Sequence, residues 1–238
     1  MAPNPPLTSA EVLKVTRASI SVLKFLRYDF CLFGSAASNY YGMSSRVAQD
    51  VDILVLARDV DEEWLKGEFV QRDKNFYRVY SVKPEATYTV LWYELSDERK
   101  CKVDLLQFGV MGIPRMPPGI AYYVQSPGYR KIPLLPFIPL LLLKVIGWRQ
   151  RARSILPHWR EKVPNDEEDI LNLLKIAVRR PDIGRLSSAP WMTRAFKRKA
   201  RGPVGLFVQK YPDSIVKWRA IGFRFSRQRE DWHKVRCA

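Results

Sequence analysis

The segment from Cys31 to Leu56 constrains the fold of this chain more than any other. It opens with a short apolar run that ends at Phe33-Gly34-Ser35 and is followed by small residues. This pattern predicts a buried strand that turns sharply into a helix. Gly34 has no side chain to obstruct a ligand, and the free N–H groups at a helix N-terminus can receive a phosphate. We therefore expect Gly34 and Ser35 to bind a phosphate group.

The same segment continues with a pair of aspartates in the run Asp50-Val51-Asp52-Ile53. Side chains alternate between the two faces of a strand, so Asp50 and Asp52 point the same way while the apolar residues between them point the other way. Two adjacent carboxylates repel each other unless a cation lies between them. The pair therefore predicts a site for a divalent metal ion.

A third carboxylate follows in Lys102-Val103-Asp104-Leu105-Leu106, where the apolar neighbours of Asp104 predict another strand. Each feature taken alone has an ordinary structural explanation. Gly-Ser pairs are mostly loops, an isolated Asp-x-Asp is mostly a solvated strand end, and Asp104 could be a charge at a strand edge. All three together, in this order and in apolar surroundings, favour an active site.

These motifs resemble the nucleotidyltransferase superfamily, whose members share a DNA polymerase beta-like palm. The signature of the superfamily is an apolar residue, Gly, then Gly or Ser, a connection, and Asp-apolar-Asp-apolar. The resemblance implies a metal-dependent enzyme that moves a nucleoside monophosphate from an NTP to an acceptor hydroxyl. Asp50, Asp52 and Asp104 would be the catalytic carboxylates and would bind Mg²⁺ or Mn²⁺, and Gly34 and Ser35 would bind the triphosphate.

Three further residues are predicted to contact the nucleotide. Arg46 precedes the aspartate pair by four residues and could contact phosphate, with a solvated loop arginine as the equal alternative. The runs Leu140 to Lys144 and Asp166 to Ile170 resemble the AbiEii-like abortive-infection toxins, a group of minimal nucleotidyltransferases. That resemblance implies that Lys144 and Asp166 bind nucleotide. Lys144 could instead extend to water from its apolar surroundings, and the choice between Asp166 and Asp169 stays open.

Positive charge is concentrated at the C-terminal end. The chain has 40 Lys and Arg against 24 Asp and Glu, a net charge of +16, and residues 191–238 hold 13 of the basic residues against 3 acidic ones. A surface this basic binds polyanions, so we expect segment 191–238 to bind RNA, with a tRNA-like 3′ end as the acceptor. Aromatic residues that could stack on bases or lie among lipid headgroups interleave with this charge: Trp191, Phe196, Phe207, Trp218, Phe223, Phe225 and Trp232.

Two other classes of protein fit the same observations. The chain could be a non-catalytic module that keeps the palm fold and binds RNA or a partner through segment 191–238. It could also be a basic protein that binds the membrane surface without inserting into the membrane.

The order of the predicted elements gives an α+β fold. A disordered leader at 1–7 precedes a palm domain at 8–128 with a small mixed β-sheet, and a mostly helical part follows at 129–238. Alternation predicts strands at 50–56, 76–82, 88–95 and 101–107, and a Pro- and Gly-rich hinge is expected at 109–128. Helices are predicted from Thr8 or Ser9, over 59–69, from Pro136 or Pro139, and from Asn165 or Asp166 to Pro181.

The cysteines and the apolar runs indicate the setting. Cys31, Cys101 and Cys237 are odd in number and fit no zinc spacing, which favours a reducing interior, either cytoplasm or nucleus. The N-terminus shows no signal-peptide pattern. The strongest apolar run, Ile132 to Ile146, is too short and too interrupted by proline to span a bilayer. We therefore expect a soluble intracellular protein.

Overall fold

A computed structural model describes residues 5–57, 59–82, 85–96, 98–117, 119–126, 129–225 and 236–237. The chain divides into two compact units. The sheet unit comprises 1–40, 46–110 and 118–135, and the helical unit comprises 41–45, 111–117 and 136–238. Residues 1–4 of the predicted leader lie outside the described residues. Leu7, at the end of that leader, is buried, and its N–H donates to Oε1 of Gln49 at 2.8 Å.

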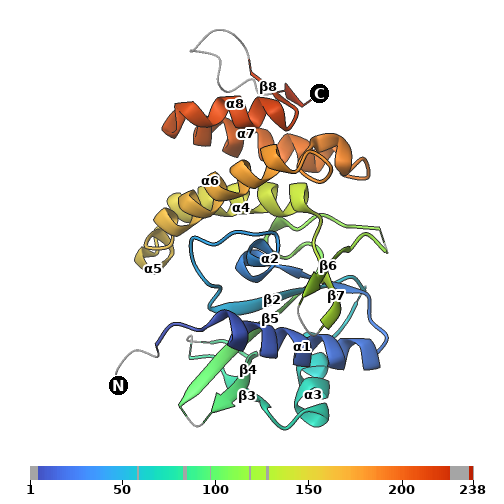
Figure 1. Cartoon of the computed structure of the whole chain (residues 1–238). Helices are drawn as coiled ribbons and strands as arrows, with labels where there is room; N and C mark the ends of the chain where they lie inside the picture. The colour runs from blue at the N-terminus through green and yellow to red at the C-terminus, as the bar shows by residue number, and fades with distance from the viewer. Residues whose placement is uncertain are drawn as a thin grey trace. The chain divides into compact units, whose positions relative to one another are not determined.

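The sheet unit contains a seven-stranded mixed sheet with the order β3-β4-β5-β2-β1-β7-β6 (Figure 1). Strand β2 pairs in parallel with β5 and β1 with β7, and the other pairs are antiparallel. The strands are β1 (Phe30–Phe33), β2 (Asp50–Val55), β3 (Phe76–Tyr80), β4 (Thr89–Ser96), β5 (Arg99–Leu106), β6 (Tyr122–Ser126) and β7 (Tyr129–Leu134). This sheet confirms the predicted α+β class.

Strands β6 and β7 form an antiparallel hairpin next to β1. Because prolines lie on both sides of β6, the sequence predicts a hinge at 109–128 and no strand there. Pro133 nevertheless lies within β7 opposite Tyr123, and Leu134 is the partner of Leu32 on β1. Strand β7, which the sequence assigned to the helical part, therefore belongs to the sheet of the first unit.

Helices α1 (Ser9–Phe25) and α3 (Glu62–Arg72) cover one face of this sheet. Phe69 of α3 packs edge-on against Phe76, which packs edge-on against Tyr93, and the Lys14 ammonium of α1 lies over the Tyr93 ring. Cys101 of β5 is the register partner of Tyr93 and shares this covered face. Alternation along β5 then directs the next residues, Lys102 and Asp104, to the opposite, open face.

Side-chain caps fix where these two helices begin. Thr8 and Glu11 form a capping box at the start of α1, as the predicted start at Thr8 or Ser9 implies. The helix predicted over 59–69 begins later, at Glu62, because the Asp61 side chain accepts a hydrogen bond from the Trp64 N–H at 3.0 Å.

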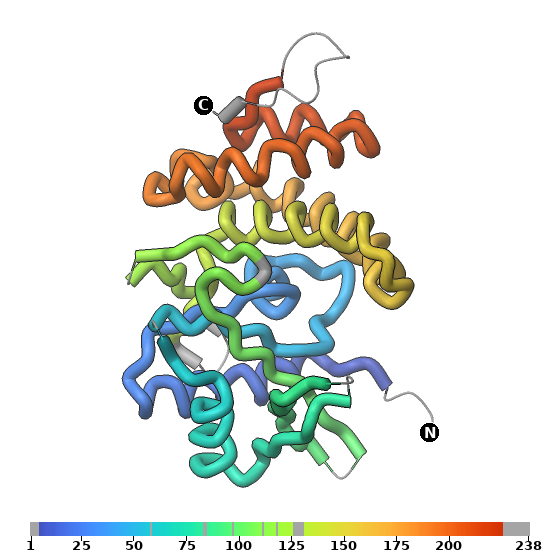
Figure 2. The backbone as a smooth tube through the Cα atoms, turned by 180° about the vertical axis from the view of Figure 1, so that it is seen from behind, coloured from blue at the N-terminus to red at the C-terminus, as the bar shows by residue number. Residues whose placement is uncertain are grey.

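The helical unit is built from α4 (Phe137–Ala152), α5 (Pro157–Arg160), α6 (Val163–Arg179), α7 (Arg194–Lys210) and α8 (Ile215–Ala220). Helices α4 and α6 lie side by side (Figures 1 and 2). Edge-on contacts between Trp148, Phe207, Trp218 and Phe223 run through its core. The unit confirms the predicted helical C-terminal part. Among the described residues, no helix is both long and apolar enough to cross a membrane.

The basic segment 191–238 is an integral part of this fold rather than a free tail in its described portion. Phe196, Phe207, Trp218 and Phe223 are at most 4% exposed. These four rings therefore pack in the core and cannot stack on RNA bases, which corrects the expectation for them. Trp191 and Phe225 are half-buried and Trp232 lies outside the described residues, so the expectation of RNA binding rests mainly on the charge of the segment.

Candidate active site

The register between β2 and β5 brings the three predicted aspartates together on the open sheet face. Asp52 is the direct partner of Asp104, and Asp50 is the partner of Lys102. One carboxylate oxygen from each of Asp50, Asp52 and Asp104 lies within 4.8 Å of the other two, and all three residues are half-buried. Two strands distant in the sequence thus supply one cluster, which we call the aspartate cluster.

The aspartate cluster has the donor chemistry of a divalent metal site. Carboxylate oxygens are the ligands that Mg²⁺ and Mn²⁺ prefer, and three like charges this close are costly without a neighbouring cation. Half-burial leaves the oxygens open to a ligand on one side. The cluster could therefore hold a divalent cation.

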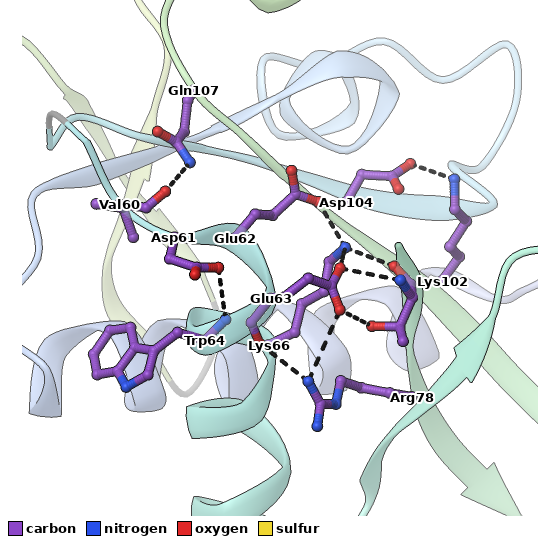
Figure 3. Close-up of polar contacts among 11 residues, drawn as sticks. Val60, Asp61, Glu62, Glu63, Trp64, Lys66, Arg78, Lys102, Asp104 and Gln107 are labelled. Atoms are coloured by element: carbon purple, nitrogen blue, oxygen red, sulfur yellow. Dashed lines mark hydrogen bonds and ion pairs between the residues drawn. The ribbon is translucent and has the colours of Figure 1, made fainter. Parts of the chain in front are cut away.

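A lysine that the sequence analysis did not assign lies within the aspartate cluster. The Lys102 ammonium donates to Oδ2 of Asp104 at 2.6 Å (Figure 3). Burial acts to lower the pKa of Lys102, but Asp104, Asp50 and Asp52 raise it overall, so the ammonium stays charged. Lys102 precedes Asp104 by two residues, and this spacing indicates only that the two side chains share one face of the strand.

Position 34 requires glycine for two reasons, the conformation of its backbone and its closeness to Asp52. It is the first residue of α2 (Gly34–Tyr40) and has φ +64°, in the left-handed region that favours glycine. A Cβ atom at this position would collide with the carboxylate of Asp52. Phe33, the residue before it, is the register partner of Asp52 on β2. The sharp turn therefore lets the backbone approach the aspartate cluster closely.

The structure also brings Ser35 and Arg46 together. Nη2 of Arg46 donates to Oγ of Ser35 at 2.8 Å. The Asn39 amide holds the loop before β2, because its Nδ2 donates to the Arg46 carbonyl at 2.8 Å and its Oδ1 accepts from the Ala48 N–H at 2.9 Å. Sequence patterns missed Asn39, since a side chain that pins a loop leaves no periodic signal.

Lys144 and Asp166 lie in the helical unit and bind different partners there. The Lys144 ammonium on α4 pairs with the fully buried Asp169 of α6. Arg151 donates to both oxygens of Asp166 at 2.6 Å. The roles of Lys144 and Asp166 in nucleotide binding remain predictions.

The start of α6 differs from the prediction. The helix begins at Val163, with Pro164 in its first turn. Because Asp166 binds Arg151, its carboxylate does not act as the helix cap that the sequence suggested.

A third acid of α6, Glu167, is held by three donors. Nε1 of Trp148 donates to it at 2.8 Å and the Tyr211 hydroxyl at 2.5 Å, and the Lys210 ammonium completes the set. Burial acts to raise the pKa of Glu167, but the hydrogen bonds from Lys210, Tyr211 and Trp148 lower it overall. We call Asp166, Glu167 and Asp169 the α6 acids.

Two cysteines are buried and carry no disulfide. Burial raises the pKa of the Cys31 and Cys101 thiols, the latter to about 12. Such thiols are protonated at neutral pH and pack as small apolar groups.

No protein-family model matches the sequence, and no curated protein sequence matches it. Among solved structures, the chain is similar to an antigenic nucleotidyltransferase-like protein from Paracoccidioides brasiliensis, with 19% identity and a TM-score of 0.68 over 91% of this chain and 95% of that one. ANT(2'')-Ia matches less well. Its crystal structure with adenylyl-2''-tobramycin has 10% identity and a TM-score of 0.39 over 72% of this chain and 99% of that one. The solution structure of this antibiotic-resistance factor has 9% identity and a TM-score of 0.42 over 90% and 99%.

The similarity to the Paracoccidioides brasiliensis protein extends over nearly the whole of both chains. It shows that this chain has the fold of a nucleotidyltransferase-like protein. The chemistry of the site has to be argued from its own residues.

Proposed function

We propose that the protein is a metal-dependent nucleotidyltransferase, which transfers a nucleoside monophosphate from an NTP to an acceptor hydroxyl and releases pyrophosphate. The observation that carries this proposal is the convergence of Asp50, Asp52 and Asp104 on one open sheet face, beside a glycine turn that only a residue without a Cβ can make. A fold shared with a nucleotidyltransferase-like protein supports it.

In this reaction the acceptor oxygen attacks the α-phosphorus and forms a new P–O bond. The bond from the α-phosphorus to the bridging oxygen breaks, and pyrophosphate leaves with that electron pair. Asp104 accepts the proton of the acceptor hydroxyl. Lys102 holds this carboxylate in place through its hydrogen bond to Oδ2.

Asp50, Asp52 and Asp104 would hold Mg²⁺ or Mn²⁺. When bound, such an ion would stabilise the negative charge that develops on the phosphoryl oxygens. Gly34 and Ser35 would bind the triphosphate, with the Arg46 guanidinium close to the Ser35 hydroxyl. Arginine suits this role because its planar donors match phosphate oxygens.

Two contacts of the nucleotide are proposed on the resemblance to the AbiEii-like group. Lys144 and Asp166 would bind the nucleotide. Both side chains already form ion pairs with protein groups, so nucleotide binding would add to these pairs or exchange with them.

RNA is the proposed acceptor, with a tRNA-like 3′ end. The support is charge, because residues 191–238 carry a net charge of +10 and polycations bind phosphate backbones by counterion release. If the segment contacts single-stranded RNA, the logarithm of affinity should fall with the logarithm of salt concentration, by about 0.7 for each phosphate contacted. Charge-reversing substitutions at the exposed Arg194 and Arg198 should flatten this slope.

The test uses NTP labelled at the α-phosphate, Mg²⁺ and total RNA. Wild-type protein should label RNA, and Asp52→Ala should abolish the labelling. Full activity in Asp52→Ala would refute the assignment. RNA binding without any metal-dependent transfer by the wild type would instead establish a non-catalytic module.

A further inference from the structure

A cavity of about 510 Å³ lies on the sheet unit directly beside the aspartate cluster. Residues of β3, β4, β5 and the start of α3 line it, and Lys102 and Asp104 form part of its wall. The proposed function does not yet use this cavity. Because it shares Asp104 with the site, a molecule bound in it would present its groups to the carboxylate that accepts the proton.

The strand register arranges four side chains in one row across the open face. Asp50 on β2 is the partner of Lys102 on β5, Lys102 is the partner of Trp92 on β4, and Trp92 is the partner of Tyr77 on β3. Neighbouring strands are about 4.8 Å apart. Trp92 is therefore one strand from Lys102 and two strands, about 10 Å, from Asp50.

The cavity combines aromatic rings with lysine ammonium groups. The Lys100 ammonium lies 4.9 Å from the centroid of the Trp92 ring, and Lys102 stands beside both. Tyr80 and Tyr88, also in the wall, are 78% and 42% exposed. A planar ring and an anion can therefore be bound at neighbouring points.

We propose that this cavity binds the terminal nucleotide of the acceptor, an inference that rests on the proposed function. The base stacks on Trp92, the phosphate binds Lys100 and Lys102, and the sugar hydroxyl lies at Asp104. Stacking on aromatic rings and pairing with lysine are the two contacts that hold single-stranded nucleic acid. A purely apolar acceptor would desolvate these lysines without compensation.

Binding of oligonucleotides tests this assignment without turnover. The probe is a 5′-fluorescein-labelled adenylate octamer with a free 3′ hydroxyl, titrated in fluorescence anisotropy with the full chain carrying Asp52→Asn. Adding Trp92→Ala should weaken binding at least about 5-fold, as loss of one stacked base does. Trp92→Phe should restore most of the affinity, and Trp64→Ala, which removes a 49% exposed ring outside the cavity, should leave it unchanged.

Two further measurements test whether the 3′ end of the oligonucleotide lies at Asp104 and whether the acceptor is an RNA end or a free nucleotide. A 3′-phosphorylated octamer should bind the Asp52→Asn protein more weakly than the 3′-hydroxyl octamer, because the added phosphate would meet Asp104. If AMP competes with the octamer at equal concentration, the acceptor is a free nucleotide rather than an RNA end.

If Trp92→Ala does not fold, Lys100→Ala should show the loss of affinity, with the exposed Lys74→Ala as its control.

Equal octamer affinity of the Trp92→Ala, Lys100→Ala and control variants would overturn the inference. The inference would also be overturned if Trp92→Ala and Lys100→Ala weakened the binding of NTP but not that of the octamer, because the cavity would then bind the donor nucleotide. Neither outcome touches the proposed function, which is tested separately by label transfer from NTP in the wild type and in Asp52→Ala.

Discussion

In the sheet unit, Asp50, Asp52 and Asp104 converge beside Lys102, whereas in the helical unit the three α6 acids pair with Arg151, Lys210 and Lys144. The aspartate cluster with Lys102 carries a net charge of −2. Asp166, Glu167 and Asp169, with Arg151, Lys210 and Lys144, sum to zero. The three aspartates of the aspartate cluster are half-buried, and the three α6 acids are buried.

The comparison distinguishes acids that stabilise the fold, the α6 acids, from acids whose negative charge a ligand could neutralise, the aspartate cluster. A buried acid is tolerated when a cation and hydrogen bonds compensate for lost water, which describes the α6 acids. Excess negative charge on an open face keeps a cost that a metal ion can remove. The same residue type should therefore respond in opposite ways to neutralisation in the two clusters.

The largest expected effect is in the helical unit. Asp169→Asn removes the carboxylate that faces the Lys144 ammonium, and breaking a buried ion pair costs about 3–5 kcal/mol of unfolding free energy. Urea unfolding measures this loss. Asp182→Asn, in an exposed pair with Arg180, should leave the free energy of unfolding nearly unchanged. Equal stabilities of the two variants would remove the distinction between the clusters.

A pH dependence should reveal the hydrogen bonds to Glu167. Because these bonds lower its pKa below the ordinary value of 4.5, its stabilising contribution is present above pH 4.5 and lost as pH falls below it. Glu167→Gln should cost about 1.5–3 kcal/mol at pH 7, and the difference from wild type should shrink below pH 4.5. Glu168→Gln, at the exposed neighbouring position, should show no such trend. A Glu167 difference that stays constant from pH 7 to pH 3 would contradict the account.

Gly34→Ala should disturb the aspartate cluster through the backbone. A left-handed alanine costs about 1–2 kcal/mol, and its Cβ would displace the Asp52 carboxylate, so nucleotidyl transfer should also be lost. Gly42→Ala is the matched control, because Gly42 has φ +102° but no atom within 4 Å of its Cβ position. Stability should fall in both variants and transfer only in Gly34→Ala. Loss of transfer in both would indicate a general defect.

The smallest effect has the opposite sign. With divalent metal removed by EDTA, Asp50→Asn should raise the unfolding free energy by about 1 kcal/mol, the repulsion between two unit charges about 4 Å apart in water. Thermal or urea unfolding would detect it. A clear loss of stability would mean that Asp50 has a structural role like that of Asp169.

Local patterns predict the faces of the aspartates but not their partners. Successive side chains of a strand point to opposite faces. The patterns at 50–56 and 101–107 therefore predict that Asp50 and Asp52 share one face and that Asp104 points away from the face of its apolar neighbours. The pairing of β2 with β5 is a long-range contact, so the position of Lys102 opposite Asp50 emerges only from the register.

The helical cluster shows a similar limit. Four consecutive acids at 166–169 leave open which of them faces Lys144. The answer depends on the start of α6 at Val163, which Pro164 determines and which the acidic run obscures. Proline also hides the β6–β7 hairpin, since it usually marks turns rather than strands.

Manganese binding tests the central claim most directly. Isothermal titration with Mn²⁺ in the presence of a non-hydrolysable NTP should show binding to the wild type and to Asp182→Asn. The double variant Asp50→Asn/Asp52→Asn should remain folded and lose this binding. If the double variant binds Mn²⁺ with wild-type affinity, the aspartate cluster is not the metal site and the proposed reaction loses its basis.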